Sequence, residues 1–322
     1  MVPVSVVVTG SSGFVGRTVV AELVRRGRTV VAVDRRPAPA VGPTGAPAGS
    51  TVPLVLTGDL LHRDELVDAA LDSASAVLHL AGCPGVRDDA PDVERRRHRD
   101  NVLATARVLA AVPHHVPVVV ASSSSVYGGS TGRPSRESDR LAPRGGYARS
   151  KVAVEDLCAR RAAAGGRVTV VRPFTVVGEG QRPDMAVARW LAAAYDDRPL
   201  EVYGSLERTR DLTDVREVGR VLATLAEPGC APTGVLNVGT GRPHTLAELV
   251  DAVADATGRA VRTRLTPAAT VEPADTWADT ARLRSVVGFV PRTDLYDVVH
   301  RQLPTAGVGL EADRPAPLAV GA

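Results

Sequence analysis

Short runs of apolar, β-branched residues alternate along the chain with segments in which apolar residues recur every three or four positions. The strand-like runs cover residues 4–10, 29–34, 52–59, 75–82, 117–124, 167–173 and 234–241. The segments with helical periodicity cover residues 15–27, 63–72, 92–112, 146–165, 185–197 and 245–258. Nearly continuous apolar strands separated by helices are typical of a parallel sheet covered on both faces. The pattern therefore predicts an α/β protein with a Rossmann, doubly wound parallel sheet.

The first strand runs directly into a glycine-rich turn. Gly10, Gly13 and Gly16 occur at three-residue spacing between this strand and the first helix. Glycines let the backbone turn tightly and approach a pyrophosphate held on the helix N-terminus. The second strand ends in Asp34, whose carboxylate can accept hydrogen bonds from a ribose 2′-hydroxyl and would repel a 2′-phosphate. We therefore expect a dinucleotide site that favours NAD over NADP, although Arg35 and its neighbour Arg36 are both able to bind such a phosphate.

The only lysine of the chain, Lys151, lies four residues after Tyr147 on a predicted helix, so both side chains face the same way. An ammonium near a phenol lowers the pKa of the phenol, and a positive nicotinamide would lower it further. The phenolate can then act as a base near neutral pH. Arg cannot easily replace the compact head of Lys, which can also bond a ribose hydroxyl.

Composition excludes several classes of function. A net charge of +3 favours a phosphorylated ligand but is too small to indicate nucleic acid. The densest basic run, residues 94–100, has acids at both ends and predicts a solvated helix face. No apolar stretch is long enough for a membrane span, and we expect no signal peptide. Cys83, Cys158 and Cys230 are scattered, which favours a cytoplasmic protein without disulfides or a metal site.

Further motifs occur in order with these features: "GDL" (58–60), "HLAG" (79–82), Asn101 and "SSSSVYG" (122–128). In this combination the chain resembles the extended short-chain dehydrogenase/reductase superfamily, in its NAD-dependent sugar-nucleotide epimerase/dehydratase branch. The resemblance covers about residues 3–303 and continues through residues 172–185, 203–215, 237–241 and 275–291. Within the branch the chain is most similar to UDP-glucuronate and UDP-glucose 4-epimerases, because "CPGVR" (83–87) and "GQRPDM" (180–185) resemble loops of the glucuronate enzymes.

The resemblance implies a role for each matching position. The catalytic residues would be Ser123, Tyr147 and Lys151. The NAD-binding residues would be Gly10, Gly13, Phe14, Val15, Gly16, Asp34, Arg35, Asp59, Leu60, Leu80, Ala81, Gly82, Asn101, Tyr147 and Lys151. The substrate-binding residues would be Arg87, Ser124, Ser125, Thr175, Arg182, Arg210 and Glu272. Of these, Arg210 would bind the diphosphate, and Arg87 and Arg182 are candidates for a sugar carboxylate or phosphate.

The implied reaction is 4-epimerisation of a nucleotide-diphosphate sugar through a transient 4-keto intermediate, with the hydride returned from NADH. Dehydratases carry an Asp-Glu pair where this chain has Ser124 and Ser125, and decarboxylases also place an acid in this stretch. An NAD(P)-dependent keto-sugar reductase or dehydrogenase remains an alternative. A noncatalytic NAD-binding regulator is a third reading, against which the intact catalytic set argues. The sugar and the base stay open, because residues 267–277 lack the Arg with which relatives often bind the diphosphate.

The chain is expected to form two units and a tail. Residues 1–173 would form the NAD-binding Rossmann domain, and residues 174–303 mainly the smaller C-terminal substrate-binding lobe, with one or two strands returning to the Rossmann sheet. Residues 36–51 and 304–322 are rich in Pro, Gly and Ala and predict a surface loop and a disordered tail. The helix over 92–112 and the helix bearing Tyr147 resemble the pair that builds a homodimer interface in this superfamily.

Overall fold

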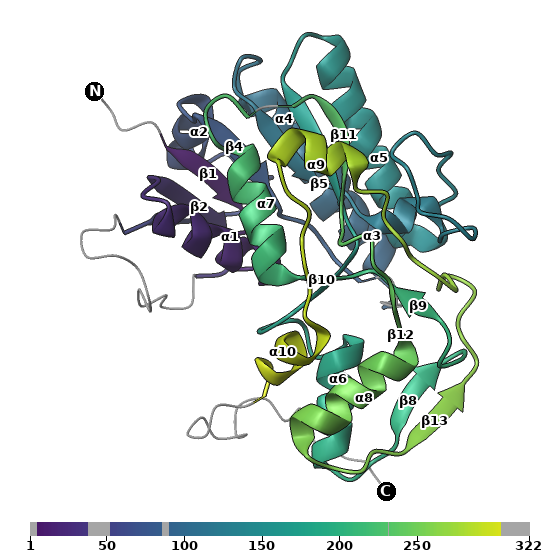
Figure 1. Cartoon of the computed structure of the whole chain (residues 1–322). Coiled ribbons are helices and arrows are strands. Elements are labelled where there is room, and N and C mark those ends of the chain that lie inside the picture. Colours follow the sequence, from purple (N-terminus) through teal and green to yellow (C-terminus); the bar gives the residue numbers. More distant parts are fainter. Residues whose placement is uncertain (1–4, 38–51, 86–89, 231, 304–322) are drawn as a thin grey trace, which may run out of the picture.

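The computed structural model describes residues 5–37, 52–85, 90–230 and 232–303. Its centre is a seven-stranded parallel sheet in the order β11-β6-β5-β4-β1-β2-β3 (Figure 1). The strands are β1 (Val6–Thr9), β2 (Val30–Asp34), β3 (Leu54–Thr57), β4 (Ala76–His79), β5 (Val118–Ala121), β6 (Val168–Pro173) and β11 (Gly234–Val238). The order reverses between β1 and β4, where Thr9 pairs with His79. The predicted doubly wound Rossmann sheet is confirmed.

Valine dominates the interior of this sheet. Val6, Val7 and Val8 of β1 are fully buried, as is Val77 of β4. β-Branched side chains are stiff and pack well on a pleated surface, so a run of valines both favours the strand and fills the space on its two faces.

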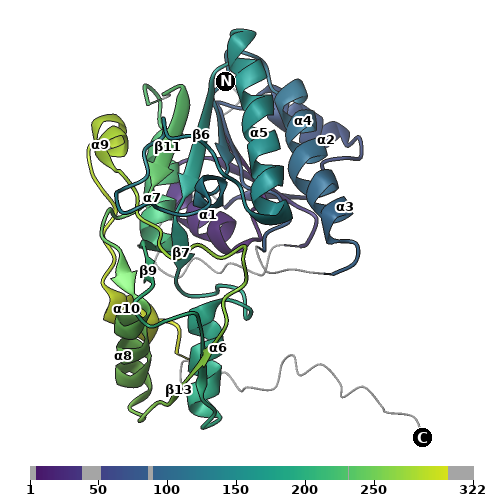
Figure 2. The same ribbon diagram turned by 90° about the vertical axis from the view of Figure 1, so that its right-hand side faces the viewer.

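Helices cover both faces of the sheet. One face carries α1 (Phe14–Arg25), α7 (Val215–Leu225) and α9 (Ala281–Val287), and their buried side chains join one apolar cluster with the sheet. The other face carries α2 (Glu65–Asp72), α5 (Gly145–Ala163) and the helical stretch over 93–111 (Figure 2). This stretch comprises α3 (Val93–Arg97), a π-helical segment (His98–Leu103) and α4 (Ala104–Ala111).

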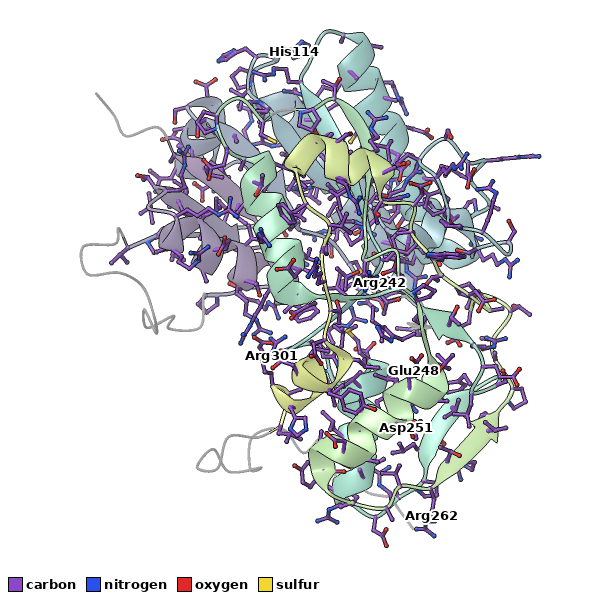
Figure 3. All side chains as sticks on the ribbon, in the orientation of Figure 1. His114, Arg242, Glu248, Asp251, Arg262 and Arg301 are labelled. Atoms are coloured by element: carbon purple, nitrogen blue, oxygen red, sulfur yellow. The ribbon has the colours of Figure 1, made fainter. Side chains whose placement is uncertain are left out.

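A smaller lobe has its own apolar core. It contains α6 (Ala186–Tyr195), α8 (Leu246–Thr257) and α10 (Leu295–His300), with β8 (Leu200–Tyr203) paired in parallel with β13 (Thr263–Thr266). Trp190 and Val253 are buried among these elements. A capping box at the start of α8, formed by Thr245 and Glu248, satisfies backbone amide groups at this helix end. Glu248 is labelled in Figure 3.

The segment after Pro173 is divided between the two units. Its β11, α7 and α9 pack with the Rossmann sheet, whereas α6, α8 and α10 build the lobe. The same segment contains two short strand pairings. β7 (Thr175–Val177) pairs with β10 (Leu212–Asp214), and β9 (Thr209–Arg210) pairs with β12 (His244–Thr245).

Arg301, just after α10, ties the lobe to the start of α7. Its guanidinium forms ion pairs with Glu179, Asp214 and Asp297, and its position is labelled in Figure 3. The Pro-rich segment over 38–51 and the tail over 304–322 lie outside the described residues.

Candidate active site

The glycine turn after β1 requires the absence of side chains at two positions. Gly10 has a φ of +71°, and a Cβ there would lie 2.6 Å from the backbone nitrogen of Ala81. A Cβ on Gly16 would lie 2.1 Å from the carbonyl oxygen of Gly10. The N-cap of α1 is Gly13, which has no side chain to cap the helix. The amide groups of the first turn are therefore available to a pyrophosphate, and these residues fit a dinucleotide.

A cavity of about 1310 Å³ opens at the carboxyl ends of the strands, where the strand order reverses. Ligands of doubly wound sheets bind at this place. All the expected NAD-binding residues except Asn101 line the cavity, as do the three expected catalytic residues. Among the expected substrate-binding residues, it is lined by Ser124, Ser125, Thr175, Arg182, Arg210 and Glu272. Arg87 lies outside the described residues.

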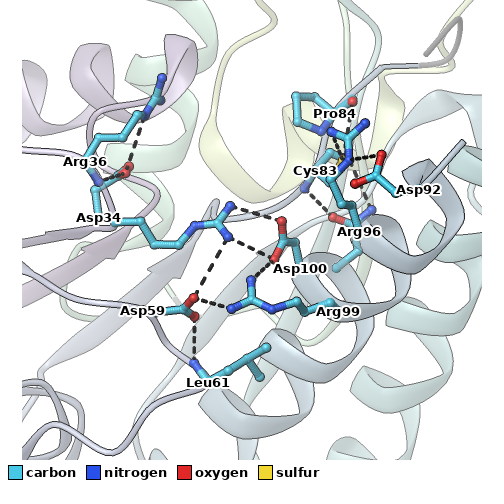
Figure 4. A network of polar contacts seen from close by, with 12 residues as sticks. Asp34, Arg36, Asp59, Leu61, Cys83, Pro84, Asp92, Arg96, Arg99 and Asp100 are labelled. Atoms are coloured by element: carbon cyan, nitrogen blue, oxygen red, sulfur yellow. Dashed lines mark hydrogen bonds and ion pairs between the residues drawn. The ribbon is translucent and has the colours of Figure 1, made fainter. Parts of the chain in front are cut away.

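The resemblance implies that the adenosine would bind at the end of the cavity next to β2, here called the adenosine end. Asp34 and Asp59 are held in place there by backbone amides. Asp34 accepts hydrogen bonds from the N–H groups of Ser12 and Arg36, each at 3.0 Å. Asp59 accepts one from the N–H of Leu61 at 3.0 Å (Figure 4). Strand β2 and the loop after β3 therefore hold both carboxylates in fixed positions.

Helix α5 places Tyr147 and Lys151 on one face, one turn apart. The Nζ of Lys151 donates to the carbonyl oxygen of Ala121 at the end of β5 (2.8 Å) and lies 5.9 Å from the centre of the Tyr147 ring. Burial lowers the pKa of Lys151 to about 8. The carbonyl of Ala121 therefore orients the Lys151 ammonium group, and the surrounding residues shield this group from water.

Burial raises the pKa of the Tyr147 phenol, although a hydrogen bond with Ser123 and the charge of Arg182 both act to lower it. A net lowering of this pKa is therefore not found in the polypeptide on its own, because desolvation of the phenolate outweighs the Ser123 hydrogen bond and the Arg182 charge. Ser123, by contrast, lies where the resemblance places it, within hydrogen-bonding reach of the phenol.

Asn101, expected among the cofactor-binding residues, does not line the cavity. Its side chain is fully buried behind the cavity wall. It accepts from the N–H of Cys83 at 2.7 Å and donates to Ser150 at 2.9 Å. A Cβ on Gly82 would lie 2.6 Å from its Oδ1. Asn101 thus connects the loop after β4 with helix α5.

His79, at the end of β4, is buried and has a structural role. Its Nδ1 is 2.7 Å from the hydroxyl of Thr9, and its Nε2 is 3.0 Å from the hydroxyl of Thr105. The Thr105 hydroxyl itself donates to the carbonyl of Asn101, so Nε2 carries the proton and Nδ1 accepts from Thr9. Burial lowers the pKa of His79 to about 3, and the Lys151 charge acts in the same direction. A neutral imidazole therefore links β1, β4 and α4.

On the substrate side, three cavity residues differ in how their polar groups are held. Arg210 donates to the carbonyl oxygens of Thr209 and Ala274, both at 2.8 Å. Arg182 donates twice to Asp184 at 2.8 Å. The buried hydroxyl of Ser125 has no hydrogen-bond partner among the described residues. The Arg210 guanidinium, already oriented by backbone carbonyls, and the unsatisfied Ser125 hydroxyl both suit a polar, anionic ligand.

The predicted solvated face over residues 94–100 is wrong for much of its length. Arg97 is buried and donates to the carbonyl of Gly85 at 2.7 Å. Arg99 and Asp100 line the cavity at its adenosine end. Sequence reasoning missed both as site residues, because a charged run gives no signal of which members turn inward.

The part of the chain that the structure describes contains neither a candidate metal site nor a membrane-spanning helix. No group of three or more His, Cys, Asp or Glu residues in it could hold a metal ion. None of its helices is both long enough and apolar enough to span a membrane. None of the three cysteines forms a disulfide.

Comparisons with known proteins agree with this site. A family model described as "NAD dependent epimerase/dehydratase family" matches residues 6–239. The chain is 29% identical over 308 residues to "Uncharacterized UDP-glucose epimerase YtcB" of Bacillus subtilis (strain 168), covering 91% of this chain and 94% of that protein. It is 29% identical over 333 residues to "Probable UDP-glucuronate 4-epimerase" of Rhizobium meliloti (strain 1021), with the same two coverages.

A solved structure, "MoeE5 in complex with UDP-glucuronic acid and NAD", superposes with a TM-score of 0.81 at 38% identity, covering 92% of this chain and 97% of that one. The match therefore extends over both the sheet and the lobe. The chain belongs to the NAD-dependent epimerase/dehydratase family.

Proposed function

We propose that this protein is an NAD-dependent sugar-nucleotide 4-epimerase, with UDP-glucuronate as the first candidate substrate and UDP-glucose as the second. The observation that carries the proposal is the pair Ser124 and Ser125. Both line the cavity next to Ser123, and the buried Ser125 hydroxyl has no partner within the described chain. Neutral hydroxyls cannot do the acid-base work of a 4,6-dehydratase, and they admit a glucuronate carboxylate without repulsion.

We assign the catalytic roles as the family resemblance implies them. Tyr147 takes the proton of the sugar 4-hydroxyl, and Ser123 hydrogen-bonds the reacting oxygen. NAD, when bound, supplies the hydride acceptor for C4 and then the donor to its opposite face, so that no net redox change occurs. Lys151 holds the ribose of the cofactor with an ammonium oriented by the carbonyl of Ala121. A bound positive nicotinamide would add the charge that offsets the burial of Tyr147.

The lobe holds the part of the substrate that does not react. Arg210 reaches the diphosphate with a guanidinium fixed by backbone carbonyls, and Thr175 and Glu272 complete this wall. The diphosphate link then serves as the pivot about which the 4-keto sugar turns to present its other face. The charge of Arg182 acts on Tyr147, which supports assigning Arg182 to a sugar carboxylate, with Arg87 as the alternative.

We further infer that residues 1–173, with the strand and helices that return to them, bind NAD, and that the lobe binds the sugar nucleotide. The chain would act as a homodimer through α5 and the helical stretch over 93–111, on which Leu103 is 44% exposed. Light scattering during size exclusion should give twice the chain mass of 33.6 kDa, and a monomer mass would refute the dimer. Free cysteines favour a cytoplasmic location.

The experiment that tests the function is proton NMR of the purified enzyme with UDP-glucuronate, and then UDP-glucose, in D₂O. A new 4-epimer without deuterium in the sugar establishes internal hydride return. Deuterium at C5 or loss of the carboxylate would mean that the 4-keto intermediate follows another route. Bulk formation of NADH would instead indicate a reductase or dehydrogenase, and no change with either sugar would exclude both candidate substrates.

A further inference from the structure

Four charged side chains form a ring at the adenosine end of the cavity. Arg35 donates to both oxygens of Asp100, at 3.2 and 3.0 Å, and lies 4.0 Å from Asp59. Arg99 donates to Asp100 at 2.6 Å and also to Asp59 (Figure 4). All four residues line the cavity. Because two cations alternate with two carboxylates, the ring is neutral and each guanidinium is shared by two acids.

The local helix geometry explains how Asp100 comes to lie in this ring. Asp100 belongs to the π-helical segment His98–Leu103, between α3 and α4. A π-helical turn is wider than an α-turn and is frequent at functional sites. Here it lets Asp100 line the cavity while the next residue, Asn101, is fully buried behind the wall. The side chain of Asp100 is 12% exposed.

Arg35 directly follows Asp34, the residue at the ribose 2′-position. In dinucleotide-binding folds an arginine near this acid accommodates the 2′-phosphate of NADP. The guanidinium of Arg35 instead makes a bidentate, charge-assisted interaction with Asp100, which is among the strong hydrogen bonds of proteins. Turning toward a 2′-phosphate would break both bonds and leave Asp100 with Arg99 alone.

We propose that Asp100 is a specificity-determining residue that withholds Arg35 from a 2′-phosphate and so works with Asp34 to select NAD over NADP. The inference rests on the NAD dependence in the proposed function and is independent of the sugar. Arg36 is the second cation near this position. Its side chain is 71% exposed and its Nε lies 3.8 Å from Asp34. The contribution of Arg36 to NADP binding is therefore expected to be the same in wild type and in all variants at position 100.

A double-mutant cycle tests the proposal. Wild type, Asp100→Ala, Arg35→Ala and the double variant are dialysed against equal concentrations of NAD⁺ and NADP⁺, and the bound nucleotides are quantified by chromatography. Asp100→Ala should raise the bound ratio of NADP⁺ to NAD⁺ at least tenfold. Arg35→Ala should change the wild-type ratio less than twofold, because Arg35 is not available there. In the double variant the gain should disappear.

Asp68→Ala is the matched control, because it also removes a carboxylate ion-paired to an arginine, Arg107 on α4, away from the cavity. It should leave the ratio unchanged. If Asp100→Ala does not fold, Asp100→Asn keeps the side-chain volume and should shift the ratio in the same direction by a smaller factor.

Two results would overturn the inference: an Asp100 variant with the ratio of wild type, or a gain that persists in the double variant. The proposed function has a separate readout, because the cycle measures only nucleotide binding. Failure of the cycle with normal NAD⁺ binding leaves the epimerase proposal standing, whereas a wild type that binds neither nucleotide contradicts both.

Discussion

The two walls of the cavity are built in different ways. The cofactor wall comes mainly from neighbouring stretches of chain: Gly10, Gly16 and Asp34 all belong to the continuous unit of β1, α1 and β2. On the lobe wall, Arg210 is held by the carbonyls of Pro273 and Ala274, more than sixty residues further along the chain. The cofactor site is therefore built mainly from a local motif, whereas the proposed sugar site forms only when distant segments of the chain come together. Substitutions on the cofactor wall should therefore affect NAD⁺ binding and the chemical step, whereas substitutions on the lobe wall should affect binding of the sugar nucleotide.

The largest effect is expected at the chemical centre. Tyr147→Phe removes the proton acceptor and should reduce kcat roughly 10³-fold, within the range for loss of a general base. NAD⁺ affinity should stay within a fewfold, because the Lys151 contact to Ala121 is retained. Steady-state turnover and nucleotide binding check the two halves of this prediction, and a variant with near-normal kcat would remove Tyr147 from the chemistry.

The next effect concerns the pH dependence of stability. Lys151 has a pKa of about 8 when folded against an ordinary value of 10.5, a difference worth roughly 3 kcal/mol. Between these values the unfolded state binds more protons, so the contribution of Lys151 to the free energy of unfolding rises with pH through this window. The free energy of unfolding of wild type and of Lys151→Met is measured by urea denaturation at each pH. The difference between the two isolates the effect of Lys151 from that of the other titrating groups. A flat difference from pH 7.5 to 10.5 would contradict the buried ammonium.

Gly16→Ala tests the close packing of the cofactor wall. The added Cβ would approach the Gly10 carbonyl to 2.1 Å, so the helix must shift, and we expect a loss of roughly 2 kcal/mol of stability together with NAD⁺ binding. At Gly58 the nearest atom to a Cβ is 3.4 Å away, so Gly58→Ala is the matched control. Similar behaviour of the two variants would show that the turn tolerates side chains.

On the lobe wall, Arg210→Ala should raise the KM for the sugar nucleotide about tenfold or more, as expected for losing a charge-assisted bond to phosphate. NAD⁺ affinity should not change, because Arg210 belongs to the lobe. Arg198→Ala is the control, since Arg198 is a lobe cation that is 62% exposed and pairs with Asp196. A loss of NAD⁺ affinity in the Arg210 variant would break the separation between the two walls.

The smallest effect is expected for Ser125→Ala. The hydroxyl has no partner in the described part of the chain, so its removal should not reduce stability and should raise KM for UDP-glucuronate roughly fivefold, the size of one hydrogen bond. Thermal unfolding and kinetics measured together check this pair of outcomes. Reduced stability with an unchanged KM would indicate that Ser125 serves the fold and not the substrate.

The helix α7 shows that some of what was missed could have been found. Its buried positions Val215, Val218, Leu222 and Leu225 follow helical spacing, and Asp214 caps its start by accepting from the N–H of Arg216. Both signals are present in the sequence. The helix was not predicted because the stretch before it was interpreted only as a diphosphate motif.

The positions of Arg99 and Asp100 could not have been found in the same way. Both belong to a charged run whose outward members, such as Arg95, look the same in the sequence. A π-helical turn shifts the register by a residue, and no periodicity in this run marks it. Nor could composition reveal that burial would outweigh the hydrogen bond with Ser123 and the charge of Arg182 in setting the pKa of Tyr147.

The sequence by itself determined the parallel sheet, the glycine turn and the pairing of Tyr147 with Lys151. Each of these depends on residues close together in the chain, where steric limits and helix or strand periods act directly. Tertiary structure decided which strand and helices of the second half returned to the sheet, which carbonyls fixed Arg210, and which acids engaged Arg35. These features depend on contacts between distant segments, and such contacts are set by the packing of the whole chain and not by any local pattern.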